Sequence, residues 1–260
     1  METADHSREG TVRVREKKGL NANQIKLIAI IAMTIDHLTW VFFPGLQTIW
    51  YVYALHIVGR LTAPIMWFFI AEGYHYTKDV RKYIGRLFLF AVISHFAYNF
   101  AFGIPFMPLS TGVFNQTGVM WSLAWAVVLL AIVHNGKVPQ WGKILSIVAV
   151  CLITFPSDWS CIAAMAPLFL YEHRGNIRLQ GRTIVIWTAM YAAVYFIFID
   201  KPYGILQMFT FLTIPILAQY NGQRGEWKGM KWLFYIYYPA HLVVVGILRI
   251  LLQGDVNILF

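Results

Sequence analysis

Long apolar segments recur along most of this 260-residue chain and are separated by short polar stretches. Most of them approach the ~20 apolar residues that an α-helix needs to cross the hydrocarbon core of a bilayer. The pattern predicts an all-α, polytopic transmembrane helical bundle of about nine spans. The predicted spans are 24–43, 49–71, 83–102, 118–134, 142–156, 160–172, 183–199, 204–220 and 232–252. The fifth and sixth are short, which is typical of a tilted pair or of a re-entrant hairpin, here turning at Pro156 to Asp158.

Composition also indicates a membrane protein, because 58% of the residues are hydrophobic and only 13% are charged. Apolar segments continue to the last residues, so residues 20–260 are predicted to form a single transmembrane domain. Residues 1–19 are polar and charged and are expected to form a disordered cytoplasmic arm.

Basic residues are distributed unevenly between the two sides of this predicted bundle. If the N-terminus is inside, 18 of the 21 lysines and arginines fall in inner segments; the exceptions are Arg60, Lys201 and Arg249. Positive charge marks cytoplasmic loops, so the N-terminus is predicted inside and the C-terminus outside. The same rule accounts for the net charge of +9, so a nucleic-acid partner is not predicted.

Several ionisable residues are predicted to lie near the middle of the bilayer. His37 is eleven residues after Lys26, and His241 is ten residues after Lys231. Along a helix these separations are about 15–16 Å, roughly half of the hydrocarbon thickness. Arg60 and His95 have similar predicted depths. Buried ionisable residues are costly and usually functional, so the sequence predicts a shared polar cavity at this depth.

The two neighbouring residues Asp36 and His37 are expected to face different ways. Asp36 shares a helical stripe with Ala29 and Ala32, and such small residues let another helix approach closely. Asp36 is therefore predicted to face a neighbouring helix while His37 faces the cavity. An ion pair between Asp36 and Arg60, which has a matching depth, is the structural alternative for both residues.

Short motifs follow one another along residues 20–245: Lys26–Ala29, Met33–His37, Gly59–Pro64, Glu72–Thr77, Lys82–Leu87, Ser157–Trp159 and Tyr237–Leu242. In their order and spacing they resemble those of the TraX family, membrane proteins that acetylate the amino terminus of conjugative pilin. More distantly, the chain is similar to the acyltransferase-3 superfamily of acyl-CoA-dependent membrane enzymes. That superfamily has an arginine followed by ten residues and a histidine, where this chain has Lys26 and His37. A lysine supplies a point charge for phosphate but lacks the bidentate fork of arginine.

The resemblance implies acetyl transfer from acetyl-CoA, which needs a base, an orienting group and a phosphate site. We expect His37 to be the catalytic base or a transient acetyl carrier, since histidine has an unperturbed pKa near 6.5. Asp36 and His241 are the other catalytic candidates. For His241 the alternative is structural, because Pro239 frees a backbone carbonyl that a histidine can satisfy.

Four basic residues are candidates for binding the phosphates or thioester of CoA: Lys26, Arg60, Arg81 and Arg86. For those near the inner face the alternative is ordinary positive-inside charge. A metal site is not predicted, because the histidines lie on separate spans without a carboxylate cluster. Cys151 and Cys161 are interpreted as packing residues, and His56, His75 and His95 as weaker candidates.

Taken with the resemblance, the sequence predicts a multi-pass acetyltransferase of the bacterial cytoplasmic membrane. Its partners would be acetyl-CoA, a peptide or glycan acceptor and the lipid bilayer. The acceptor group would be an amine or a hydroxyl, such as a pilin-like peptide N-terminus or an envelope glycan. A transporter that uses buried Asp, His and Arg is the main alternative, although no internal repeat is visible. A structural assembly factor would explain the hydrophobicity but not the buried Asp36 and His37.

Overall fold

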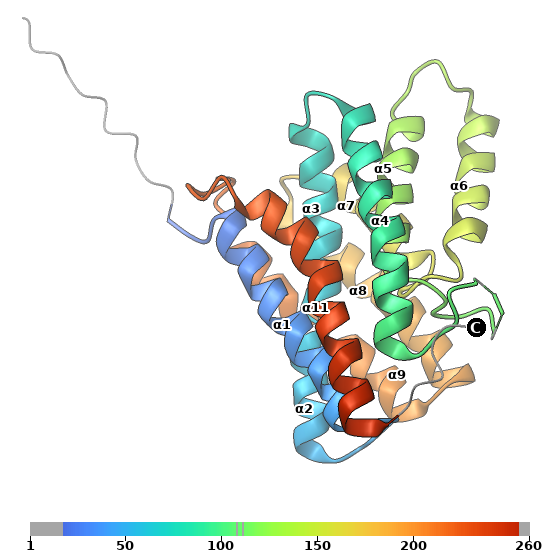
Figure 1. Cartoon of the computed structure of the whole chain (residues 1–260). Helices are drawn as coiled ribbons and strands as arrows, with labels where there is room; N and C mark the ends of the chain where they lie inside the picture. Colours follow the sequence, from blue (N-terminus) through green and yellow to red (C-terminus); the bar gives the residue numbers. More distant parts are fainter. Residues whose placement is uncertain (1–17, 108, 111, 255–260) are drawn as a thin grey trace, which may run out of the picture.

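The computed structural model describes residues 18–107, 109–110 and 112–254. The predicted cytoplasmic arm, residues 1–19, lies almost wholly outside these residues. The described part is all-helical and contains no strand, as the sequence predicted. Its helices run side by side as a bundle (Figure 1).

The helices follow one another along the chain with short connections. The first half contains α1 (Ala22–Phe42), α2 (Trp50–Gly59), α3 (Thr62–Tyr76), α4 (Val80–Phe102), α5 (Met120–Val133) and α6 (Gln140–Thr154). The second half contains α7 (Ile162–Glu172), α8 (Ile177–Phe198), α9 (Lys201–Met208), a 3₁₀ turn (Phe209–Leu212), α10 (Thr213–Ala218) and α11 (Met230–Gln253).

Five segments are long and apolar enough to cross a membrane: 22–42, 50–76, 80–102, 177–198 and 232–253. Each of the nine predicted spans contains a helix or a broken helix, but α5, α6 and α7 have only 14, 15 and 11 residues. At 1.5 Å per residue these are about 16–23 Å long, shorter than a hydrocarbon core of about 30 Å. The protein is thus a multi-pass membrane protein, while the nine-span count and the orientation stay predictions.

Helix boundaries follow local sequence signals. The side chain of Asn21 caps α1 in a capping box with Gln24, and Asp79 caps α4. The predicted second span is interrupted between α2 and α3 at Arg60 and Leu61. Pro64, in the first turn of α3, has no N–H to donate to the carbonyl of Arg60, so a continuous helix is interrupted there.

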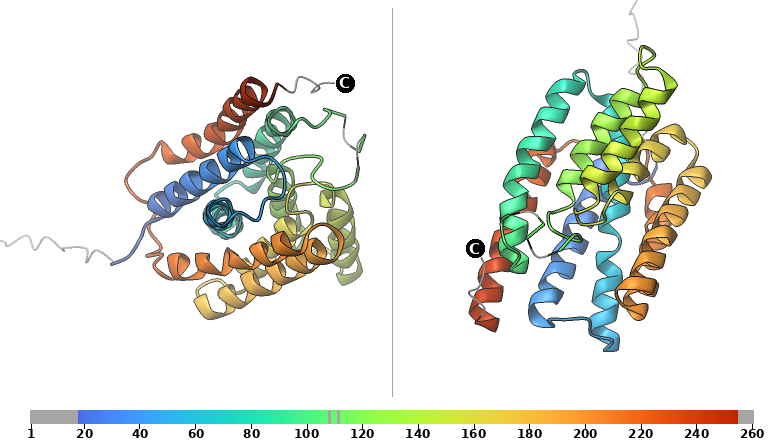
Figure 2. Two further views of the ribbon diagram at one scale, coloured as in Figure 1. Left: turned by 90° about the horizontal axis from the view of Figure 1, so that it is seen from below. Right: turned by 90° about the vertical axis from the view of Figure 1, so that its right-hand side faces the viewer.

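Helix α3 occupies the centre of the bundle. Every residue from Ala63 to Glu72 is buried, and the helix packs against α1, α5 and α7. A helix that is apolar on all sides is buried on all sides. Seen along the bundle, the α2–α3 segment is surrounded by the other helices (Figure 2).

The bundle has two distinct ends. We call the end with residues 18–26 and the connections 77–79, 134–139, 173–176 and 219–229 the basic end. The end with the connections 43–49, 103–119, 155–161 and 199–200 is the far end. Helices α5 and α6 stop at mid-height, whereas α1, α2 and α11 extend further toward the far end (Figure 1). The 155–161 connection and the adjoining residues 115–119 therefore lie within the bundle beside the long helices, where Gln116, Ser157 and Trp159 are buried.

Candidate functional site

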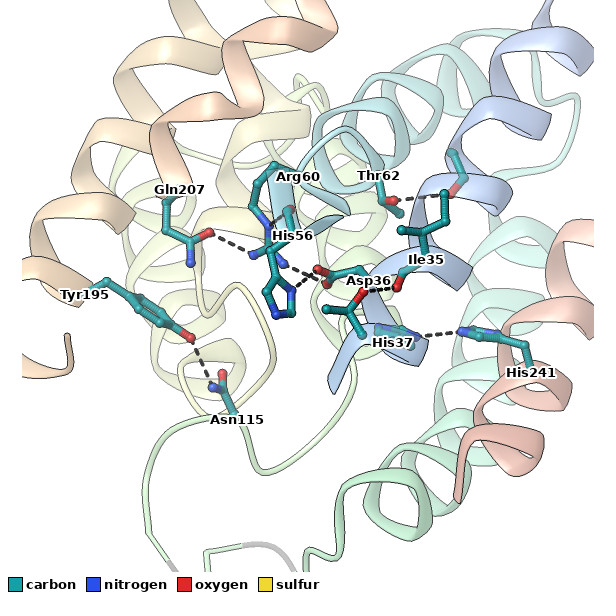
Figure 3. Close-up of polar contacts among 12 residues, drawn as sticks. Ile35, Asp36, His37, His56, Arg60, Thr62, Asn115, Tyr195, Gln207 and His241 are labelled. Atoms are coloured by element: carbon teal, nitrogen blue, oxygen red, sulfur yellow. Dashed lines mark hydrogen bonds and ion pairs between the residues drawn. The ribbon is translucent and has the colours of Figure 1, made fainter. Parts of the chain in front are cut away.

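A buried cluster of charged and polar groups joins α1, α2 and α9 (Figure 3). The Asp36 carboxylate accepts a hydrogen bond from Arg60 at 2.7 Å through one oxygen and from His56 Nδ1 at 2.8 Å through the other. Arg60 also donates to the carbonyl of His56 at 3.2 Å and to Gln207 Oε1 at 3.0 Å. The ion pair named as the structural alternative is thus present, and both of its side chains are nearly buried.

Close packing of two helices brings this cluster together. A Cβ atom added to Gly59 would lie 2.4 Å from the Asp36 side chain, so only glycine leaves room for the carboxylate. Ala29 and Ala32 are buried on the same side of α1, and Thr62 donates to the carbonyl of Ala29 at 3.2 Å. The prediction that Asp36 faces a neighbouring helix is therefore correct, and small residues permit the contact.

A second polar contact joins α1 to α11. His37 Nδ1 lies 2.7 Å from His241 Nε2, and the two rings are nearly parallel (Figure 3). His241 Nδ1 lies 2.9 Å from the carbonyl of Tyr237, which can only accept, so this nitrogen carries the proton. In neutral His241 the other nitrogen, Nε2, is then an acceptor, and His37 Nδ1 donates to it. In neutral His37 the unprotonated nitrogen is then Nε2.

The buried cluster, through Asp36 and Arg60, and the His37–His241 pair, through His37, border a cavity of about 360 Å³ near the far end. We call it the far cavity. Its lining includes Asp36, His37, Arg60 and Asp158, and several aromatic rings: Trp40, Tyr98, Phe102, Trp159, Tyr191, Tyr195, Tyr203 and Tyr238. Asn115, which lies 3.4 Å from Tyr195 Oη, contributes from the 103–119 connection. The size is that of a small-molecule site with a few polar groups in an apolar wall.

A second cavity of about 450 Å³ lies toward the basic end, and we call it the basic cavity. Its lining contains three basic residues, Lys26, Arg86 and Arg224, and one acidic residue, Glu72. Glu72 is paired with Arg174 at 2.6 Å. The Lys26 ammonium also lies 4.8 Å from the centre of the Phe69 ring. Met66, at the middle of α3, lines both cavities.

The structure divides the predicted site residues into two groups. Asp36, His37 and Arg60 line the far cavity with His241 behind His37, whereas Lys26 and Arg86 line the basic cavity. Arg60 is therefore placed away from the other three basic candidates. Arg81 is exposed and lines neither cavity.

His95, predicted at the same depth as His37, lies elsewhere. Its two ring nitrogens are 3.0 Å from Thr117 Oγ1 and 2.9 Å from the carbonyl of Phe106, so it anchors the 103–119 connection. His75 is exposed at the end of α3.

Sequence reasoning ranked His56 low and did not single out Gln207, Arg224 or the tyrosines of the far cavity. The position of His56, four residues before Arg60 on one face of α2, was the available signal for it. Nothing in the sequence distinguishes the cavity tyrosines from ordinary packing residues. Within the described residues, three or more His, Cys, Asp or Glu side chains do not gather in a metal-binding arrangement.

Comparisons with known proteins connect the chain to one family. Residues 21–249 match the family model described as TraX protein. A curated relative from Dichelobacter nodosus, named probable fimbrial assembly protein FimC, serogroup H1, is 31% identical over 245 residues. The alignment covers 90% of this chain and 97% of that protein. No solved structure matches the chain.

Proposed function

Given that the chain belongs to the TraX family, we propose that it is an acetyltransferase of the bacterial cytoplasmic membrane that uses acetyl-CoA. The observation that carries this proposal is the pair of cavities whose linings share Met66. One cavity is basic, and the other contains an oriented histidine. The donor would enter from the basic end, on the cytoplasmic side, and the acceptor from the far end.

The charge of the basic cavity supports an anionic donor. Its three cationic side chains outnumber its one carboxylate, and Glu72 is already neutralised by Arg174. The phosphates of CoA would bind Lys26, Arg86 and Arg224, because charge-assisted hydrogen bonds to phosphate are among the stronger ones. The thioester arm would then extend along α3 toward Met66.

In the far cavity His37 would act as the base. Its Nε2 would take a proton from the acceptor nitrogen or oxygen as that atom bonds to the acetyl carbon. The carbon–sulfur bond of the thioester then breaks, and His37 returns the proton to the departing thiolate of CoA. His241 accepts the hydrogen bond from His37 Nδ1, so it fixes the ring orientation and tautomer, as an orienting partner does for other catalytic histidines.

The acceptor is proposed from the family and the relative. A protein named for fimbrial assembly fits a pilin-like peptide amino terminus as the acceptor, with an envelope glycan hydroxyl as the second possibility. Both would approach from the outer face if the N-terminus is inside.

The test uses the full chain in lipid nanodiscs. Calorimetry with acetyl-CoA should detect binding, and CoA thiol release should depend on a short peptide with a free amino terminus. His37→Ala should bind acetyl-CoA normally and release thiol ~10²–10⁴-fold more slowly, which is the usual cost of losing a general base. His75→Ala, an exposed histidine on α3, is the matched control and should behave as the wild type.

Lys26→Ala should raise the KM for acetyl-CoA with a smaller effect on kcat, because it removes binding and not chemistry. Absence of acetyl-CoA binding by the wild type would reject the proposal. Normal thiol release by His37→Ala would reject the role of that residue.

A transporter is the second candidate, because two cavities toward opposite ends of a bundle that are separated by one shared side chain also fit alternating access. Solute uptake into proteoliposomes distinguishes a transporter from an acetyltransferase. Time-dependent uptake of a small labelled solute, abolished by Asp36→Asn, together with no binding of acetyl-CoA, would favour transport.

A further inference from the structure

The positive and negative charges of the side chains that line the far cavity do not sum to zero. With His37 neutral, as a general base must be, the charged side chains of this cavity are Asp36, Arg60 and Asp158. Asp36 and Arg60 neutralise each other at 2.7 Å. The carboxylate of Asp158 forms no ion pair with any residue that the structure describes. With Asp158 ionised the cavity therefore has a net charge of −1, which one monovalent cation would balance.

The backbone around Asp158 holds the carboxylate of this residue at the cavity. The backbone N–H of Asp158 donates to the carbonyl of Thr117 at 2.8 Å, so the 155–161 connection is bonded to the 103–119 connection. The next residue, Trp159, has a left-handed backbone with φ of 61°. Few residues other than glycine adopt this conformation, and here packing compensates for it. The Trp159 ring stacks on the Tyr191 ring, with ring centres 4.6 Å apart, and meets the Trp67 ring edge to face, with ring centres 5.3 Å apart.

Aromatic rings provide the rest of the surroundings. Trp159, Tyr98, Tyr191, Tyr195 and Tyr238 line the same cavity as Asp158. The faces of such rings attract cations, and the attraction grows when water is excluded. Arg60 already lies 5.7 Å from the centre of the Trp159 ring. A carboxylate beside several aromatic rings is suited to a compact ammonium group.

We propose that Asp158 and the aromatic rings around it form a subsite that binds the protonated primary amine of the acceptor. The inference rests on the proposed function and names the residues that would hold an amine acceptor. A bound ammonium gives one proton to the Asp158 carboxylate and becomes a neutral nucleophile. Its second proton then goes to His37 as its nitrogen bonds to the acetyl carbon, and from there to the thiolate of CoA.

The experiment compares two small probes of nearly the same shape, alaninamide and lactamide. They differ in one group, which is an amine in the first and a hydroxyl in the second. At pH 7 an α-amino group with a pKa near 8 is mostly protonated. Saturation-transfer NMR on the wild-type chain in nanodiscs, without acetyl-CoA, measures the affinity of each. We expect alaninamide to bind at least tenfold more tightly than lactamide.

Variants then test whether Asp158 causes the tighter binding of alaninamide. Asp158→Asn should weaken alaninamide binding at least tenfold and leave lactamide unchanged, whereas Asp158→Glu should retain most of the affinity. Asp79→Asn is the matched control, because Asp79 is a carboxylate of the basic end that lines neither cavity and asparagine also caps a helix. It should bind both probes as the wild type does.

The proposal is overturned if the wild type binds both probes with equal affinity or does not bind alaninamide. It is also overturned if Asp158→Asn binds alaninamide with the affinity of the wild type. The wild-type comparison needs no variant, so the proposal stays testable even if Asp158→Asn does not fold. The assay contains no acetyl-CoA, so its outcome is independent of the proposed function. A chain that binds alaninamide through Asp158 but never binds acetyl-CoA would retain the subsite and lose the acetyltransferase assignment.

Discussion

The ion pair between Asp36 and Arg60 gives the sharpest test of the buried cluster. Replacing Asp36 with asparagine removes the charge that neutralises Arg60 and places an amide donor near the guanidinium. Arg60 keeps its hydrogen bonds to the His56 carbonyl and to Gln207, so one of its three partners is lost. Removing one partner of a buried pair typically costs ~3–5 kcal/mol, because the other charge stays buried and unpaired.

Arg60→Gln should cost a similar amount, since it strands the Asp36 carboxylate with His56 as its remaining partner. The double variant Asp36→Asn with Arg60→Gln removes both charges. It should be little less stable than either single variant, whereas independent effects would add to ~6–10 kcal/mol. We therefore expect a coupling free energy of roughly 3–5 kcal/mol, at or above the top of the usual range for contacting residues.

The assay is unfolding in mixed detergent micelles by added SDS, followed by circular dichroism, for the wild type, both single variants and the double variant. Asp36→Asn combined with Arg174→Gln is the control. Arg174 pairs with Glu72 at the basic end, so these two changes should be additive. Additivity within ~0.5 kcal/mol for Asp36 and Arg60 as well would refute the pairing. If the double variant folds but does not transfer acetyl groups, the pair also serves catalysis.

Three further outcomes are expected. Gly59→Ala should cost ~1–3 kcal/mol in the same micelle titration, because its Cβ would lie 2.4 Å from Asp36; unchanged stability would contradict that close approach. Met66→Trp should bind acetyl-CoA but release no thiol, because the bulkier side chain closes the junction of the two cavities, whereas Met66→Leu should stay active; an active tryptophan variant would place the thioester path elsewhere. In a cysteine-free background, an impermeant maleimide should label Ser110→Cys in intact cells and Gly136→Cys only after permeabilisation, and the reverse result would invert the predicted orientation.

Hydrophobic patterning by itself determined where the helices lie. Four of the long apolar segments became the single helices α1, α4, α8 and α11, because a long apolar run can satisfy its backbone groups in a bilayer only as a helix. The helical rise also placed Asp36, His37, Arg60 and His241 at a common depth. The family was identifiable from motifs spread over residues 20–245, and the match to residues 21–249 confirms it.

Only the tertiary structure decided which of these residues meet. Depth is a single coordinate along the bundle axis, and His95 has the predicted depth of His37 yet anchors a connection instead. His241 meets His37 because α11 packs against α1, and the angular order of helices is not encoded in any single segment. Asp158 reaches the far cavity because α6 and α7 are short and their connection folds inward. These contacts depend on packing between segments distant in sequence, whereas hydrophobic periodicity reports only the environment of each segment separately.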